Sequence, residues 1–179
     1  TNQDEIISAV LNYVKSTVKW NELYGYACDN GVKKAYKDKI GNVAEINLML
    51  TAMLRYAGLD ANPVLVSTRE NGIAIFPSRM AFNYVIAAVE APEGLILLDA
   101  TSKFSNPNVL PFQDLNWMGR LIRKDGTSED VDLMPKKASA DNVIMVYAID
   151  ATGKITGKLR RQRTDHNAMG FRSKIENIK

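Results

Sequence analysis

Few residues of this chain have the chemistry of a covalent catalyst. The sequence has 179 residues and contains one cysteine and one histidine, Cys28 and His166. A cysteine becomes a nucleophile when a neighbouring base takes its proton or a positive field lowers the pKa of its thiol. Cys28 lies near the N-terminus and His166 in the C-terminal segment, so Cys28 is a candidate nucleophile only if the fold brings it beside a base. A free cysteine is more often a small buried hydrophobic residue, and we take that as the default interpretation.

The same two residues bear on metal binding. One cysteine and one histidine far apart in the sequence do not form a metal site of recognisable spacing. We therefore expect no metal ion and no cofactor.

Residues 41–58, GNVAEINLMLTAMLRYAG, are predicted to form the helix around which the rest of the chain is organised. Asn42 is a suitable N-cap, and Glu45, three residues later, completes a capping box. The segment is apolar on nearly all sides, which is typical of a buried helix. The N-terminus of such a helix favours a thiolate, because the helix dipole and free N–H groups stabilise negative charge. Here the first helical residues are Val43 and Ala44, which carry no nucleophile.

The remaining elements follow from hydrophobic spacing and turn residues. Apolar residues at helical spacing predict a helix over residues 3–19, and a shorter amphipathic helix is predicted over 31–39. Between them, the stretch from Trp20 to Cys28 is predicted to be a loop. Strands are predicted over residues 62–68, 81–90, 95–99, 117–124, 128–133, 143–149 and 154–163. The turns Ala-Pro-Glu-Gly, Asp-Gly and Ala-Thr-Gly predict that the last six strands form three hairpins.

Composition and charge set limits on the class of protein. The chain is 46% hydrophobic and 24% charged, which is ordinary for a globular protein, and its net charge of +3 implies no nucleic-acid or membrane partner by itself. No apolar run approaches the roughly 20 residues needed to span a bilayer. A basic run, Lys158, Arg160, Arg161 and Arg163, has no aromatic residues interleaved with it. We interpret it as a solvated strand face and expect no nucleic-acid binding.

Three phrases of the sequence carry a resemblance to a known family. They are GNVAEINLMLTAMLRYAGLDANPVLV at residues 41–66, FNYVIAAVE at 82–90 and LLDAT at 97–101. They resemble the transglutaminase-like core, a relative of the papain-like cysteine proteases, in which a Gly-x-Cys turn leads into a helix and later strands read FNH-V and LD-T. The likeness covers about residues 10–115. It implies an α+β fold, in which a buried central helix packs on an antiparallel β-sheet, here followed by C-terminal β-hairpins.

The resemblance also assigns the positions of the family's catalytic triad. The nucleophilic cysteine aligns with Val43 and the general-base histidine with Tyr84, while the orienting aspartate is kept as Asp99. Valine has no nucleophilic atom, and a tyrosine near its usual pKa of ~10 is a poor base at neutral pH. Because residues that act as a unit lose nearly all activity when one is removed, the chain is expected to lack acyl transfer and peptide hydrolysis.

Each triad position has a structural and a functional interpretation. Val43 is expected to be a core residue, although it could line a pocket left at the former active site. Tyr84 is expected to donate a hydrogen bond to Asp99, and a bond to a ligand is the alternative. Trp20 lies where the family often has an aromatic residue at the cleft border. Trp20, Tyr84 and Asp99 are therefore the ligand-binding candidates.

Three functions are compared. The first, which we favour, is a catalytically inactive transglutaminase-like module that acts as a binding or architectural domain of a larger envelope protein. The second is an enzyme of the transglutaminase or cysteine-peptidase type with displaced chemistry, which uses Cys28 or a carboxylate in a remodelled cleft. The third, an ordinary cysteine-type enzyme of this family, is nearly excluded by Val43 and Tyr84.

The domain organisation, location and partners are expectations of the same kind. Residues 1–135 are expected to form the core with its hairpin, and residues 136–179 a linker and the start of a truncated β-rich domain. The chain begins at Thr1 and is interpreted as a segment excised from a longer protein. The family analogy implies a periplasmic or cell-envelope location, with flanking domains of the same chain as partners. A protein or glycan is expected to bind, if anything does, at the former active-site cleft.

Overall fold

An antiparallel sheet forms the centre of the first part of the chain in the computed structural model, which describes residues 2–76, 78–176 and 178. Within these residues the sheet has five strands in the order β5-β4-β3-β6-β7. The strands are β3 (Ala61–Val66), β4 (Tyr84–Ala91), β5 (Gly94–Leu98), β6 (Met118–Ile122) and β7 (Ser128–Asp132). All neighbouring strands are antiparallel. The α+β class and the antiparallel sheet expected from the sequence are confirmed.

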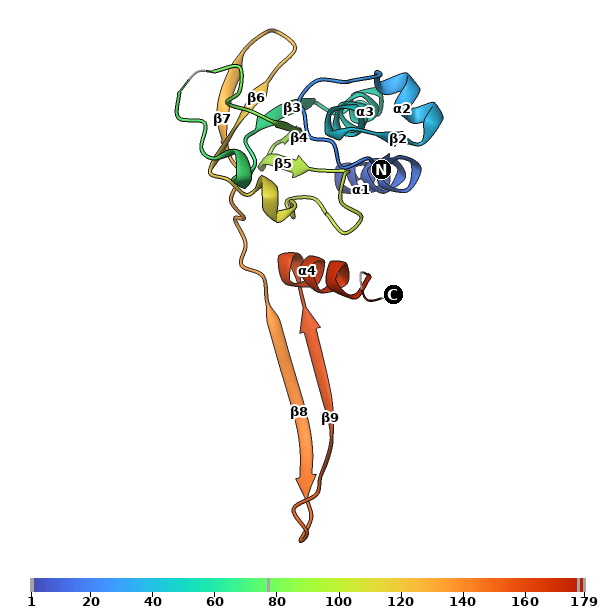
Figure 1. The fold of residues 1–179 in the computed structure, drawn as a ribbon, viewed down its shortest axis with the longest axis vertical. Helices are drawn as coiled ribbons and strands as arrows, with labels where there is room; N and C mark the ends of the chain where they lie inside the picture. Colours follow the sequence, from blue (N-terminus) through green and yellow to red (C-terminus); the bar gives the residue numbers. More distant parts are fainter. Residues whose placement is uncertain (1, 77, 177, 179) are drawn as a thin grey trace. The chain divides into compact units, whose positions relative to one another are not determined.

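Helices lie beside this sheet (Figure 1). They are α1 (Gln3–Thr17), α2 (Val32–Asp38) and α3 (Val43–Tyr56), close to the predicted ranges. Apolar residues of α1 and α3, such as Leu11 and Leu50, pack in one buried cluster with Ala87 and Val89 of β4. A second cluster joins Val43 to strand residues that include Tyr84. Two very short strands, β1 (Lys19–Trp20) and β2 (Ile40–Gly41), pair in parallel and correct the prediction of a loop from Trp20 onward.

The N-terminus of α3 is fixed by the predicted capping box. The Asn42 Oδ1 accepts a hydrogen bond from the Glu45 backbone N–H at 2.9 Å, and the Glu45 Oε2 accepts from the Asn42 N–H at 2.9 Å. The other carboxylate oxygen of Glu45 accepts from the N–H groups of Asn30 and Gly31. Glu45 is buried, and backbone N–H groups supply donors to both of its side-chain oxygens. It therefore ties the loop before α2 to the start of α3.

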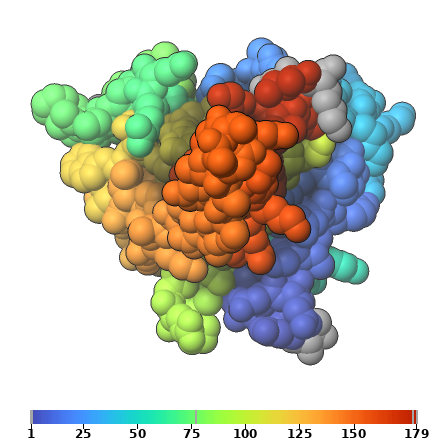
Figure 2. Space-filling model, turned by 90° about the horizontal axis from the view of Figure 1, so that it is seen from below, coloured from blue at the N-terminus to red at the C-terminus, as the bar shows by residue number. Residues whose placement is uncertain are grey.

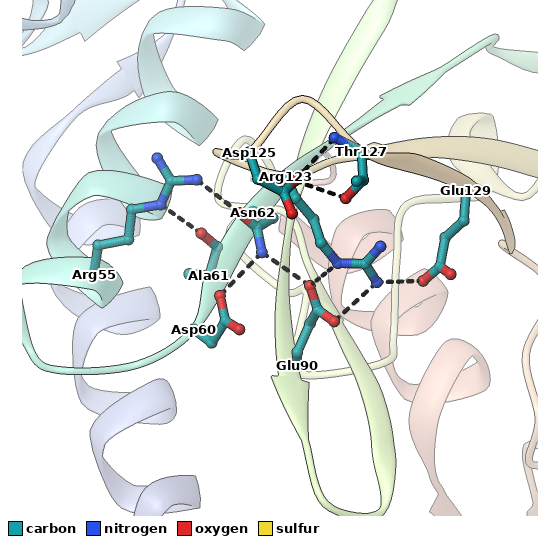
Figure 3. A network of polar contacts seen from close by, with 9 residues as sticks. All are labelled: Arg55, Asp60, Ala61, Asn62, Glu90, Arg123, Asp125, Thr127 and Glu129. Atoms are coloured by element: carbon teal, nitrogen blue, oxygen red, sulfur yellow. Dashed lines mark hydrogen bonds and ion pairs between the residues drawn. The ribbon is translucent and has the colours of Figure 1, made fainter.

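A network of polar contacts joins neighbouring elements at the end of β4 that carries Glu90 (Figure 3). Arg123 donates two hydrogen bonds to the Glu90 carboxylate, at 2.7 and 2.9 Å, and one to Glu129. Buried Asn62 donates to Glu90 and accepts from Arg55 near the end of α3. Because Glu90 and Tyr84 lie near opposite ends of β4, this network is remote from the predicted triad positions.

The chain divides into two compact units, Thr1–Pro135 (unit 1) and Lys136–Lys179 (unit 2). Unit 2 consists of the strands β8 (Asp141–Ile149) and β9 (Ile155–Arg163), which form a hairpin, and the helix α4 (Asp165–Glu176). The hairpin was predicted, whereas α4 was not. The first turn of α4 is held by Ser139, whose hydroxyl oxygen accepts from the His166 N–H at 3.1 Å.

The two faces of the hairpin differ. Residues directly opposite each other in an antiparallel pair point to the same face, so the register assigns one face that is mainly apolar and one that is mixed. The apolar face carries Val143, Met145, Tyr147, Ile149, Ile155 and Leu159, each more than half exposed. The mixed face carries Lys158 and Arg160. Figure 2 looks onto the tip of this hairpin, whose side chains are drawn in orange.

Substitution of the α3 N-cap provides a test of the capping box. We expect Asn42→Ala to lower the free energy of unfolding by about 2 kcal/mol, the upper end for an N-cap, because it also removes a buried bond from the amide to the Ala27 carbonyl. The matched control is Asn2→Ala at the exposed N-cap of α1, with an expected loss of about 0.5 kcal/mol. Chemical denaturation measures both losses. Equal losses of unfolding free energy in the two variants would contradict the inference that the α3 cap contributes more to stability than the α1 cap.

Candidate functional site

The carboxylate of Asp99 is the centre of the candidate site. It follows β5 and is completely buried. Its Oδ1 accepts hydrogen bonds from the Asn47 side-chain amide at 2.9 Å and from the Thr101 N–H at 2.8 Å. Its Oδ2 lies 2.8 Å from the Tyr84 hydroxyl and 3.0 Å from the Thr101 hydroxyl. The two oxygens are thus supplied with donors, as a buried charge requires.

Asn47 fixes this aspartate to the central helix. It lies one turn into α3 and is completely buried. Its amide nitrogen donates to Asp99 and to the Val85 carbonyl, and its amide oxygen accepts from the Ala100 N–H at 2.9 Å. One side chain therefore joins α3, β4 and the residues after β5.

Tyr84, which the sequence resemblance aligns with the family's histidine, is completely buried. The hydrogen bond to Asp99 that the sequence analysis expected is present. Burial and the nearby carboxylates of Asp99 and Asp114 raise the pKa of the Tyr84 hydroxyl well above its usual value of 10. The phenol therefore stays protonated at neutral pH. It can donate a hydrogen bond but cannot act as a general base.

A second carboxyl group, Asp114, lies beside this cluster. It belongs to the short 3-10 helix η2 (Phe112–Asp114) and is completely buried. Among the described residues, neither of its side-chain oxygens has an N–H or O–H partner. Burial, followed by the neighbouring Asp99, raises the pKa of the Asp114 carboxyl well above its usual value. The protonated, uncharged form of Asp114 is therefore favoured in the folded protein.

Val43, which the sequence resemblance aligns with the family's nucleophile, has a packed side chain. Val43 is fully buried and belongs to the same apolar cluster as Tyr84. The backbone groups at the start of α3 also have partners, since the Val43 N–H donates to the Leu23 carbonyl at 3.2 Å and the Asn42 N–H to Glu45. These two N–H groups are thus engaged within the protein and are not available to stabilise a thiolate or an oxyanion at this helix end.

Aromatic residues of the loop after β1 approach the cluster from its exposed side. The ring of Tyr24 lies 5.8 Å from that of Tyr84 and 5.6 Å from that of Trp20. The Tyr24 hydroxyl donates to the side-chain oxygen of Gln113 at 2.9 Å, and the Gln113 nitrogen donates to the Tyr84 hydroxyl at 3.3 Å. A chain of hydrogen bonds therefore leads from partly exposed Tyr24 to buried Asp99.

Cys28 does not have the environment of a reactive cysteine. It is partly buried against the apolar cluster that contains Val43. Burial, then Glu45, then Asp29 raise the pKa of the Cys28 thiol above its usual value. The structure assigns Cys28 to unit 1 and His166 to unit 2. The described residues hold no group of three or more His, Cys, Asp or Glu suited to a metal ion.

The predicted site residues thus differ in how accessible they are to a ligand. Tyr84 and Asp99 are in contact, and a ligand could reach them only by displacing the side chains that bury them. Trp20 is partly exposed, and its indole N–H donates to the Leu23 carbonyl at 3.2 Å. The sequence analysis missed Asn47, Gln113 and Asp114. No local motif marks these residues, and only the fold brings them to Asp99.

Comparison with known proteins supports the fold and little more. No protein-family model and no curated protein sequence matches the chain. One solved structure, a "putative protease" from Parabacteroides distasonis, is similar with a TM-score of 0.53 and 14% sequence identity. The match covers 84% of this chain and 31% of that chain, so this chain spans about a third of its structural neighbour. At this identity the likeness concerns the fold alone. No helix among the described residues is long and apolar enough to cross a membrane.

The reactivity of Cys28 tests whether it has replaced the missing nucleophile. We expect a thiol-specific alkylating reagent to react with Cys28 more slowly at pH 7 than with an unstructured cysteine peptide, because the raised pKa of the thiol reduces the thiolate fraction. Asp29→Asn removes one of the charges that oppose the thiolate and should increase the rate roughly twofold. Asp38→Asn, at an exposed residue of α2, is the matched control and should leave the rate unchanged. A reaction faster than that of the peptide would support the displaced-nucleophile alternative.

Proposed function

We propose that unit 1 is a transglutaminase-like core that has lost catalysis and serves as a binding or architectural module of a larger envelope protein. The observation that carries this proposal is the closed triad position. Val43 and Tyr84 are packed in one buried cluster, and the Asp99 carboxylate is bound by Tyr84, Asn47 and Thr101. These positions carry neither a thiol nor an imidazole, and the Val43 N–H already has a carbonyl acceptor, which supports a structural role for the cluster.

The architectural form of this proposal has more support than the binding form. Tyr84 and Asp99 are completely buried, and Trp20 has a hydrogen-bond partner within its own loop. A protein or glycan that used these residues would first have to open the cluster. Binding at the former cleft would therefore depend on movement of the loops that carry Tyr24 and Gln113.

Unit 2 supports a place in a longer polypeptide. A two-stranded hairpin is marginally stable alone, and six large apolar side chains on one face of this hairpin are more than half exposed. The structural neighbour is a much longer chain, and its match extends past unit 1, which ends at residue 135. We propose that further strands of the same polypeptide cover the apolar face of the hairpin. The envelope location remains part of the proposal and rests on the family analogy.

An enzyme with displaced chemistry is the alternative function. Its candidate groups are Cys28 and the carboxyl groups of Asp99 and Asp114, but the thiol has a raised pKa and both carboxyl groups are buried. Hydrolysis of generic peptide and acyl substrates by the unmodified chain, lost in Cys28→Ser or Asp114→Asn, would establish this alternative.

Restoring the two missing triad residues tests the alignment behind the proposal. In a Cys28→Ser background, we expect Val43→Cys combined with Tyr84→His to give a thiolate that forms at lower pH than in Val43→Cys alone, because the imidazole would lie within hydrogen-bond reach of the thiol. Titration of the thiolate absorbance measures the difference without requiring a reagent to enter the core. Identical titrations, or a sulfur-to-imidazole distance well beyond ~4 Å in a structure of the variant, would show that the alignment is wrong.

The hairpin face provides a test of the architecture. If the apolar face normally packs against further strands, this chain alone should self-associate through it. We expect Tyr147→Thr with Leu159→Thr to reduce self-association in sedimentation experiments. Lys158→Thr with Arg160→Thr on the mixed face is the matched control and should not reduce it. Equal behaviour of the two double variants would count against a covered apolar face.

A further inference from the structure

Asp114 is a buried acid whose polar partner is another acid. Its side chain is completely buried, and its oxygens have no N–H or O–H donor among the described residues. Its carboxyl group neighbours that of Asp99, because the adjacent residue Gln113 donates to the Tyr84 hydroxyl, which in turn is bonded to Asp99. Two ionised carboxylates offer only acceptors, so no hydrogen bond forms between them unless one carries a proton. A proton on Asp114, donated to Asp99, satisfies both groups.

Asp99 is the member of the pair that is held in place by donors. It accepts hydrogen bonds from Asn47 and from the Thr101 N–H. Asp114 has no such donors, and it lies on a three-residue 3-10 helix and not in the sheet. If the shared proton is lost, repulsion between two buried carboxylates acts on a fixed group and a less constrained one. The segment of Asp114 is therefore the part that moves.

The other ionisable groups around the pair do not remove this repulsion. The hydroxyls of Tyr24 and Tyr84 face Asp114, and both are neutral acids whose pKa is raised. Lys15 is near Asp99, but its ammonium group donates to the Ser105 carbonyl at 2.7 Å, and burial lowers its pKa. Arg69 donates to the Leu115 carbonyl next to Asp114. Neither cation makes an ion pair with the two carboxyl groups among the contacts of the described residues.

The segment that carries Asp114 also covers the site. Residues 111–116 contain Gln113, which links the Tyr24 hydroxyl to that of Tyr84, and Asn116, which donates to the carbonyls of Ser67 and Gly72. These contacts are side-chain hydrogen bonds, and none belongs to a sheet ladder. Displacement of the segment would break the chain from Tyr24 to Asp99 and uncover Tyr84.

We propose that residues 111–116 form a pH-sensitive latch, which is closed over Tyr84 and Asp99 while Asp114 shares a proton with Asp99 and opens when that proton is lost. The latch concerns the same buried cluster as the proposed function, but it does not depend on the absence of catalysis. The restored-triad experiment tests the proposed function and the experiments below test the latch. Either proposal can therefore fail while the other holds.

The direction of the pH effect follows from proton linkage. The pKa of Asp114 is higher in the closed protein than in the open or unfolded chain, so the closed form binds more protons. Closure is therefore fully favoured below the usual aspartate range and weakens as the pH rises toward the pKa of the closed form. Over that interval the opening equilibrium constant rises about tenfold per pH unit, which corresponds to about 1.4 kcal/mol. Above the pKa of the closed form the dependence ends.

Hydrogen exchange of the backbone amides in residues 110–117, measured from pH 5 to 9 and corrected for intrinsic exchange rates, tests the latch. In the unmodified chain we expect protection to decrease up to tenfold per pH unit over part of this range. Asp114→Asn places an amide donor against Asp99 without a titrating proton, so its protection should be independent of pH. Asp38→Asn, at an exposed carboxylate, is the matched control and should behave as the unmodified chain does.

The proton itself can be observed without any variant. Infrared spectroscopy of the unmodified chain at pH 6 to 7 should show the carbonyl band of a protonated carboxylic acid, and the band should disappear over the pH range in which protection of residues 110–117 is lost. Absence of the band at pH 6, or protection in residues 110–117 that does not change with pH while the band disappears, would overturn the latch. If Asp114→Asn does not fold, the infrared and exchange measurements on the unmodified chain still decide.

Discussion

A buried negative charge sets the main constraint on this fold. The Asp99 carboxylate is completely removed from water, and such a charge persists only where donors replace its hydration. Asn47 of α3, Tyr84 of β4 and Thr101 after β5 provide those donors. Each donor comes from a different part of unit 1. Satisfying one carboxylate therefore fixes the central helix, the sheet and the following loop relative to one another.

The same carboxylate explains how a catalytic geometry can become structural. In the family that the sequence resembles, an aspartate orients a histidine, and the histidine activates a cysteine. Here the group bound to Asp99 is a phenol with a raised pKa, and the next position along, Val43, is packed in the apolar cluster. Asp99 thus holds an aromatic side chain in place through a hydrogen bond. Without a base or a nucleophile, the hydrogen bond contributes to stability and has no proton to pass on.

Much of the fold could be predicted from the sequence because its signals are local. The capping box of α3 uses residues that are three positions apart, and the turn residues Asp125-Gly126 predict the hairpin of β6 and β7. By contrast, β1 and β2 are two residues long and depend on the pairing of Lys19 with Ile40, 21 residues apart, so no periodicity reveals them. Helix α4 has weak apolar spacing, and the contact of its first turn with Ser139 is visible only in the fold.

The candidate site was predictable only in part, for a related reason. A resemblance could align Tyr84 and Asp99, and the chemistry of a phenol and a carboxylate then predicted their hydrogen bond. Nothing in the sequence near Asp114 distinguishes it from the exposed aspartates of the chain. Its burial depends on the path of residues 102–117, which contain no regular structure longer than the three-residue helix η2. The groups that bury a charge are long-range neighbours, whereas sequence patterns report short-range ones.

Acidic side chains are stabilised differently at the two ends of β4. At one end, Glu90 faces the guanidinium group of Arg123, and both side chains are partly exposed. Such a pair is screened by salt, and because it lowers the pKa of the Glu90 carboxyl it changes little near neutral pH. At the other end, the contacts of the described residues include no ion pair to Asp99 or Asp114. Neutral hydrogen-bond donors and a shared proton stabilise these two carboxyl groups instead. The stability of the first end should respond to ionic strength and that of the second to pH, because one end balances charge with charge and the other avoids a second charge.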